Sequence, residues 1–221
     1  MKNLLLLLIL ITTVCSAQDR GFNASQSSNA FSNNLNVFAM QKIDKIYNGV
    51  LSGSSNGSVY LFKEFEECII YHNSKDSYYK ANANYNVYSD QFEVLIDNEL
   101  YLLDQKSVKE IQQGDRVFLP NPSEKQQKKY MEIIAEGKNI SLVIVYEARV
   151  LEAQTQTLGL VENKIKLVNK DYFILDNELV KVPNSNSKIL KILKLTEQQK
   201  KKFGGENLKN LDTLISLIKN I

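Results

Sequence analysis

Residues 130–151 read YMEIIAEGKNISLVIVYEARVL, and this stretch decides the fold class. Two runs of apolar and β-branched residues, 130–135 and 140–151, flank the turn signal Gly137-Lys138, a pattern that predicts a β-hairpin. Residues 142–145 are all apolar, so the second strand carries apolar side chains on both of its faces. A strand of this kind lies in the interior of a sheet. We therefore expect a sheet that extends beyond the hairpin on both sides.

Other short runs of β-branched and aromatic residues surround this hairpin. Before it, we expect strands over 59–63, 68–72, 85–88, 91–96, 99–103 and 116–119. After it, we expect a meander over 165–168, 172–175 and 179–182, with turns at 169–171 and 176–177. The pattern predicts a mainly β fold (α+β overall), either an antiparallel sandwich, a barrel or a rolled sheet, followed by a short C-terminal helical segment.

Two segments share a strand–Asp-Asn–strand spelling, VLIDNELYL at 94–102 and FILDNELVK at 173–181. An Asp-Asn pair between two strands is typical of tight hairpin turns, because both residues tolerate a positive φ. We interpret the similarity as the same turn chemistry used twice rather than as an internal duplication.

The pattern becomes helical after Pro183. Ser185 or Ser187 is positioned to cap a short helix that runs through Leu195, and Thr196 with Gln199 forms a capping box for a second helix that ends at 204–205. Residues 206–220 predict a third, amphipathic helix. Its expected apolar stripe consists of Leu208, Leu211, Leu214, Ile215 and Ile218.

The first 17 residues, MKNLLLLLILITTVCSA, have the pattern of a secretory signal peptide. A lysine precedes an apolar run that is too short to span a membrane, and small residues lead to a cleavage site after Ala17. Lipoprotein processing at Cys15 is the alternative, although Val14 stands where a small residue is expected. We therefore expect an exported protein, periplasmic, outer-membrane-associated or secreted, with no transmembrane span in the mature chain. Cleavage leaves Cys68 alone, which excludes an intramolecular disulfide.

The expected organisation is a signal peptide (1–17), a largely flexible polar leader (18–57), a β-rich domain (58–182) and a basic helical segment (183–221) that packs on or beside that domain. Hydrophobic residues make up 43% of the chain and charged residues 24%, which is the composition of a globular protein. The net charge of +2 is too balanced for a protein that binds nucleic acid over its whole surface.

Few residues are available for catalysis or metal binding. Cys68 and His72 share one face of a predicted strand, but four residues along a strand span about 13 Å, which is too far for a thiolate–imidazole pair. The chain contains no Cys-x-x-Cys, His-x-x-x-His, EF-hand or phosphate-loop pattern. We therefore expect no cofactor and no bound metal, and we assign no catalytic residue.

Charge is distributed unevenly. Residues 183–221 contain eight lysines against three acidic residues, a balance of +5, whereas residues 18–182 have 18 basic and 22 acidic residues, a balance of −4. The candidate contact residues are Lys188, Lys191, Lys194, Lys200, Lys201 and Lys202. Such a surface suits an anionic envelope component or an acidic protein partner. The alternatives are docking on the chain's own acidic body and a plain solvated face. Without arginine or interleaved aromatic residues, nucleic acid is not the expected partner.

Several phrases occur in a familiar order: a signal peptide, a polar leader, NGSVYLF (56–62), YNVYSDQFEV (85–94), GDRVF (114–118) and a lysine-rich helical C-terminus. This layout resembles a group of uncharacterised secreted or periplasmic β-rich proteins of Bacteroidota. The resemblance implies export in a Gram-negative bacterium and a β-rich body with C-terminal helices, and it transfers no active-site residue.

We therefore favour a non-enzymatic binding or cell-envelope-associated module. The alternative is a carboxylate-dependent hydrolase that acts on an envelope or extracellular polymer, which a pocket with two facing carboxylates would favour. A third possibility is self-association through SLVIVY (141–146), if that strand were exposed at a sheet edge. The oligomeric state does not follow from the sequence.

Export generates the first prediction. When the whole chain is expressed in a Gram-negative host, we expect the protein outside the cytoplasm with Gln18 as its first residue, because the cleavage site follows Ala17. N-terminal sequencing and intact mass of the periplasmic and culture fractions measure this. A full-length cytoplasmic protein would contradict export, and a mature chain that begins at lipid-modified Cys15 would replace simple cleavage with lipoprotein processing.

Overall fold

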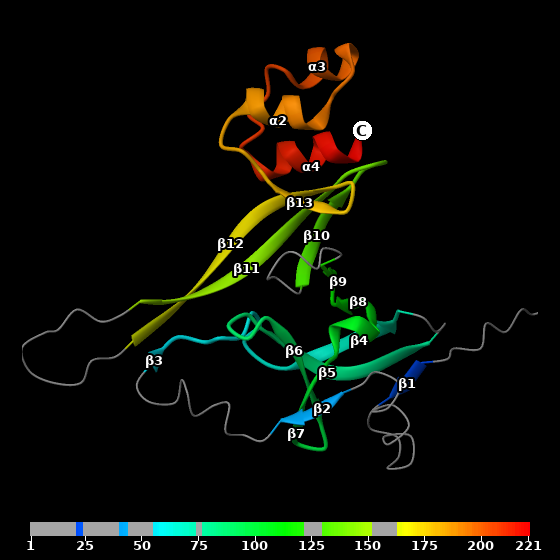
Figure 1. Ribbon diagram of the computed structural model, residues 1–221, viewed down its shortest axis with the longest axis vertical. Helices are drawn as coiled ribbons and strands as arrows, with labels where there is room; N and C mark the ends of the chain where they lie inside the picture. The colour runs from blue at the N-terminus through cyan, green and yellow to red at the C-terminus, as the bar shows by residue number, and fades with distance from the viewer. Residues whose placement is uncertain (1–20, 24–39, 44–54, 74–76, 122–129, 152–162) are drawn as a thin grey trace, which may run out of the picture.

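The computed structural model describes residues 21–23, 40–43, 55–73, 77–121, 130–151 and 163–221. The predicted signal peptide and most of the predicted polar leader lie outside these residues. The described residues form a sheet of mostly antiparallel strands, and short helices follow it at the C-terminus (Figure 1). The predicted mainly β fold class with a short C-terminal helical segment is confirmed.

Within the described part of the chain, eleven strands form one open path with an edge at each end. The path runs β13 (Glu178–Lys181), β12 (Asn163–Leu175), β11 (Ser141–Leu151), β10 (Tyr130–Glu136), β9 (Arg116–Pro120), β8 (Val108–Gln113), β4 (Glu66–His72), β5 (Tyr78–Asn86), β6 (Gln91–Ile96), β7 (Glu99–Leu102) and β2 (Gln41–Ile43). Two short strands add parallel pairs, β1 (Gly21–Asn23) with β5 and β3 (Ser55–Asn56) with β12. A 3₁₀ turn, η2 (Gln105–Ser107), precedes β8.

The predicted hairpin around Gly137 forms from β10 and β11, and β11 lies between β10 and β12 as its apolar residues require. β11 and β12 pair along eleven positions, from Ser141 opposite Ile174 to Leu151 opposite Lys164. In Figure 1 these two strands extend together well beyond the rest of the sheet. The segment SLVIVY is thus a central strand rather than an exposed edge.

The predicted turn at Asn169–Asp171 is wrong, because β12 continues through it as a single strand. Asn169 pairs with Tyr146 and Asp171 pairs with Ile144 on β11. Asn and Asp favour turns, but this local preference is weak. A long ladder of main-chain hydrogen bonds between two strands overrides it. The second expected turn is confirmed by the positive φ angles of Asp176 (50°) and Asn177 (63°).

The two segments with the shared Asp-Asn spelling form equivalent hairpins, β6–β7 and β12–β13. Asp97 and Asn98 have φ angles of 49° and 62°, close to those of the second Asp-Asn pair. Two consecutive positive φ values are the signature of a type I′ turn, whose twist matches that of the flanking strands. The common spelling therefore reflects common turn geometry.

Two other strand predictions differ from the structure, and one strand of the sheet was not predicted. Residues 59–63 do not form a strand. They make one isolated bridge, between Tyr60 and Asn86, and are held beside β5 by the side chain of Asn84, which hydrogen-bonds the main chain of Phe62 and Glu64. β5 begins at Tyr78 rather than at residue 85. β8 was not predicted, because its sequence VKEIQQ contains only two apolar residues.

The helical cap consists of α2 (Asn186–Leu193), α3 (Glu197–Phe203) and α4 (Leu211–Lys219). Ser185 caps α2, accepting from the main-chain N–H of Lys188. The capping box of α3 is present in both directions, and in one of them the main-chain N–H of Thr196 donates to Oε1 of Gln199 over 2.9 Å. These local predictions are confirmed because capping depends only on residues within one turn of the helix start.

α4 lies nearest to the sheet, against β10 and β11, and α2 and α3 lie above it (Figure 1). Its backbone approaches the β10–β11 turn so closely that a Cβ atom at Gly137 would lie 2.5 Å from the carbonyl oxygen of Ile218. The predicted apolar stripe is partly wrong: Leu211 is 38% exposed, whereas Leu217, which was not part of the stripe, is fully buried. The stripe shifts because the sheet covers the C-terminal half of α4.

Two apolar cores lie on the same face of the sheet, one on each side of a polar region. The upper core joins β10–β12 to the cap and includes Ala135, Leu142 and Phe173. The lower core contains a cluster of rings from Tyr85, Phe92, Phe118 and Tyr130 with centroid separations of 5.0 to 6.2 Å. A third, smaller cluster of Met131, Val143 and Val145 occupies the reverse face.

The shifted stripe of α4 generates the second prediction. Leu217→Ala should lower the free energy of unfolding by about 2–5 kcal/mol, because it leaves a cavity beneath a fully buried side chain. Leu211→Ala in the same helix should change it by less than about 1 kcal/mol, because that side chain is partly exposed. Urea unfolding followed by circular dichroism measures both. Equal losses for the two variants would contradict this placement of α4.

Candidate functional site

The six candidate lysines are all exposed and lie on α2, on α3 or at the end of α2. The buried residue of α2, Ile189, and that of α3, Phe203, both belong to the upper core. Because these two helices form the layer farthest from the sheet (Figure 1), their lysines face solvent on the outside of the cap. The structure therefore brings the six lysines to one end of the molecule.

The lysines differ in their surroundings. Nζ of Lys200 lies 2.7 Å from Oε1 of Glu197, and Nζ of Lys202 lies 4.9 Å from the ring centre of Phe203. For the other four, Lys188, Lys191, Lys194 and Lys201, the structure gives the ammonium group no ion pair, hydrogen bond or ring contact with any described residue. Lys194 also has a left-handed backbone with φ 48°. The lysines without an intramolecular partner among the described residues are thus those on α2 and at its C-terminal end, together with the middle lysine of the run in α3.

Cys68 is a core residue. It is 1% exposed, and its Sγ atom donates to the carbonyl oxygen of Ala81 over 3.2 Å. Burial raises the pKa of the thiol to about 12, so the nucleophilic thiolate is not populated at neutral pH. His72, at the end of the same strand, is also buried.

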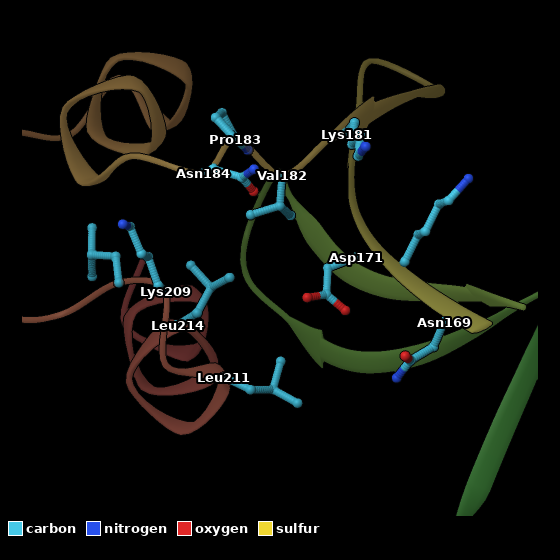
Figure 2. Close-up of a pocket in the computed structure, with 11 residues that line it drawn as sticks. Asn169, Asp171, Lys181, Val182, Pro183, Asn184, Lys209, Leu211 and Leu214 are labelled. Carbon is cyan, nitrogen blue, oxygen red and sulfur yellow. The ribbon is translucent and has the colours of Figure 1, made fainter.

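A pocket of about 510 Å³ lies where β12 and β13 meet the start of α4 (Figure 2). Its volume is within the range of small-molecule sites in proteins. The sheet side contributes Asn169, Lys170, Asp171, Lys181, Val182, Pro183 and Asn184, and the cap side contributes Leu208, Lys209, Leu211 and Leu214. The pocket therefore combines charged groups with an aliphatic wall.

Asp171 points into this space from the sheet side (Figure 2). It lies on the cap-facing side of β12, two residues from the fully buried Phe173. No described residue donates a hydrogen bond to its carboxylate, and partial burial raises the pKa of the carboxyl group above its usual value of 3.8. A half-buried carboxylate without a partner is unfavourable for folding.

Glu132 is a second carboxylate in the same row of the sheet as Asp171. The row consists of Glu132, Ile144 and Asp171, which lie side by side on β10, β11 and β12. The guanidinium group of Arg116 binds Glu132 through two hydrogen bonds of 2.7 and 2.6 Å, and the hydroxyl of Tyr146 also donates to this carboxylate. Glu132 is therefore fully compensated although it is buried. Asp171, two strands away in the same row, has no such partners.

Sequence reasoning missed Asp171, because Asn169–Asp171 was interpreted as a turn. The available signal was a polar triplet between two apolar strand-like runs. Whether this triplet forms a turn or part of a strand depends on the length of β11, the strand that pairs with it. The residues around the triplet carry no information about that length. Polar residues inside a strand on its core-facing side contradict local propensity, and such conflicts occur at functional sites.

The pocket contains one carboxylate and three lysines. A second pocket, of about 620 Å³ beside the end of α2, also contains one acidic side chain, that of Asp176. Neither has the two facing carboxylates that a glycoside-hydrolase mechanism requires. Among the described residues, no cluster of three His, Cys, Asp or Glu side chains is suited to hold a metal ion. The helices that the structure describes include none with the length and apolar character to cross a membrane.

No protein-family model, curated protein or solved structure matches this chain. The resemblance to exported Bacteroidota proteins, and the localisation that it implies, therefore remain predictions.

Asp171 generates the third prediction. Because folding raises the pKa of this carboxyl group, the folded state binds the proton more tightly than the unfolded state, and this contribution to stability is lost as the pH rises through the folded pKa. Asp171→Asn should therefore be more stable than the wild type at pH 7, with a difference that shrinks as the pH falls toward about 4.

Urea unfolding between pH 4 and pH 8 measures this difference. Asp115→Asn is the matched control, because Asp115 is exposed in the β8–β9 turn and should show no comparable stabilisation. If Asp171→Asn were less stable than the wild type at pH 7, the carboxylate would have favourable partners in the folded protein, contrary to the geometry of the pocket.

Proposed function

We propose that this chain is an exported, non-enzymatic binding module of the cell envelope that contacts an anionic component through the lysines on the outside of its helical cap. The observation that carries the proposal is the arrangement of the cap: its apolar side chains are directed into the upper core, while the six candidate lysines face solvent. Residues 183–221 have a balance of +5.

Four of the six lysines have no charged or aromatic partner among the described residues, so their charges are available to an external ligand. An intramolecular docking of the lysines on an acidic part of the sheet would require ion pairs between them. Among the described residues, Lys200 forms an ion pair with Glu197. Both residues belong to α3, so this ion pair does not connect the cap to the sheet. This favours an external partner over docking on the chain's own body.

The partner class follows from the charge. Clustered lysines at a surface are attracted to anionic headgroups and to acidic proteins, and the attraction is screened by salt. Export, as proposed from residues 1–17, would place the cap opposite envelope lipids and lipopolysaccharide. The hydrolase alternative receives no comparable support, because each pocket described above contains a single acidic side chain.

Removal of the cap is not a suitable test, because it would expose Leu142 and Phe173 of the upper core. The fourth prediction instead uses the chain from residue 18 onward with Lys188, Lys191 and Lys201 all changed to Gln. Each lysine near an anionic bilayer contributes about 1 kcal/mol, so the triple variant should bind anionic liposomes roughly 100-fold more weakly than the wild type. Co-sedimentation at low and high salt measures the binding.

The matched control changes Lys63, Lys106 and Lys109 to Gln, which removes the same charge from exposed positions away from the cap. We expect this control to bind like the wild type at low salt and both proteins to lose binding at high salt. Equal weakening by the two triple variants would contradict a specific role of the cap, because it would show that binding depends only on the overall charge of the protein. No binding of the wild type to anionic liposomes would exclude a lipid surface and leave an acidic protein as the partner to test.

A further inference from the structure

We propose that the pocket between β12 and α4 binds a small zwitterion with an aliphatic group, the chemistry of a free aliphatic amino acid, whose ammonium group contacts Asp171. The pocket is distinct from the outward lysine face of α2 and α3, because its walls come from the sheet and from the start of α4 (Figure 2). Its volume of about 510 Å³ accommodates a ligand of this size.

Asp171 supplies the group that recognises the ammonium. Its carboxylate points into the pocket and receives no hydrogen bond from a described residue (Figure 2). Partial removal from water disfavours its charged form, in agreement with the raised pKa. An ammonium group restores the lost solvation through charge-assisted hydrogen bonds. The same carboxylate that is unfavourable for folding is therefore favourable for binding such a ligand.

One of the three lysines that line the pocket, Lys209, distinguishes a zwitterion from a simple amine. Lys181 pairs with Tyr172, the neighbour of Asp171 in β12, and so lies on the opposite face of the sheet from Asp171. Nζ of Lys170 is held 2.6 Å from Oε2 of Glu147, so its charge is already paired. Lys209 is exposed, lies immediately before the start of α4, and its ammonium group has no partner among the described residues. It would repel a bare cation and attract an acidic group. In the proposed complex, the ammonium group of the ligand contacts Asp171, and its acidic group contacts Lys209 at the other side of the pocket.

The wall opposite Asp171 is aliphatic. Leu211 and Leu214 face the pocket from α4, and Val182 faces it from the sheet side (Figure 2). Leu211 is 38% exposed, an unusual state for a large apolar residue of the predicted core stripe. A ligand with an aliphatic side chain would cover Leu211 and gain from removing that surface from water.

The fifth prediction uses three probes that share the branched aliphatic side chain of leucine. L-leucine carries both charges, 4-methylpentanoate lacks the ammonium group, and 3-methylbutylamine lacks the carboxylate. We expect isothermal titration calorimetry to show saturable binding of leucine, with about tenfold weaker binding of each of the other two, since one charge-assisted contact is lost in each.

The variants assign each charge to its residue. Asp171→Asn should weaken leucine binding about tenfold and leave 4-methylpentanoate unchanged, because only leucine has the group that contacts this carboxylate. Lys209→Gln should weaken leucine and 4-methylpentanoate and strengthen 3-methylbutylamine, because it removes the charge that repels a bare cation. Lys109→Gln, an exposed lysine on β8, is the control and should change nothing. Lys209 is exposed, so its variant keeps the test valid even if Asp171→Asn were poorly folded.

Three outcomes would overturn the proposal. They are no leucine binding at probe concentrations in the tens of millimolar, equal binding of the three probes, and leucine binding that neither variant weakens. Because leucine is uncharged overall and soluble, these results are independent of liposome binding by the cap. The two proposals can therefore fail separately.

Discussion

The structure depends on one strand that is apolar on both faces. β11 lies between β10 and β12, and its residues alternate between the upper core, through Leu142, and the cluster on the reverse face, through Val143 and Val145. A strand with this character is stable only if both faces are removed from water. The helical cap covers one face, which explains why α4 packs directly on the β10–β11 hairpin.

The length of β11 determines the path of β12. Main-chain N–H and C=O groups of a central strand need partners along their whole length, and β12 provides them at eleven consecutive positions. The ladder therefore continues through Asn169, Lys170 and Asp171, although these residues favour a turn. Asp171 is placed on the cap-facing side of a strand as a consequence of pairing, not of its own preference.

Two carboxylates with different surroundings, those of Glu132 and Asp171, lie between the two cores on the same face of the sheet. Glu132 is buried and held by Arg116 and Tyr146, an arrangement that stabilises its charge. Asp171 is half-buried beside an open pocket and lacks such donors. A protein that needed only stability would place an apolar or paired residue there. The unpaired carboxylate, with an aliphatic wall opposite it, is the feature on which the proposed ligand chemistry rests.

The cap has a divided role. Residues of each helix that point inward, such as Ile189 and Leu217, complete the upper core. Those that point outward on α2 and α3 are largely lysines, whose charge contributes little to folding because exposed ion pairs are weak. The surface charge of the cap can therefore be altered without disturbing the core, whereas the helices cannot be removed.

The sequence by itself determined the features that depend on neighbouring residues. The β10–β11 hairpin, the Asp-Asn turns at 97–98 and 176–177, and the caps at Ser185 and Thr196 all follow from patterns a few residues long. The exposed lysines of α2 also come from a local pattern, because their spacing among apolar residues assigns them to the outer side of the helix.

Three features were decided only by the tertiary structure. They are the continuous β12, the burial of Leu217 instead of Leu211 in α4, and the pocket that Asp171 lines. Each of these depends on which strand or helix lies opposite, and those partners are distant in the sequence. Burial and hydrogen bonding are properties of the assembled contacts, so a residue that favours a turn locally can become part of a strand once a long partner strand supplies the ladder.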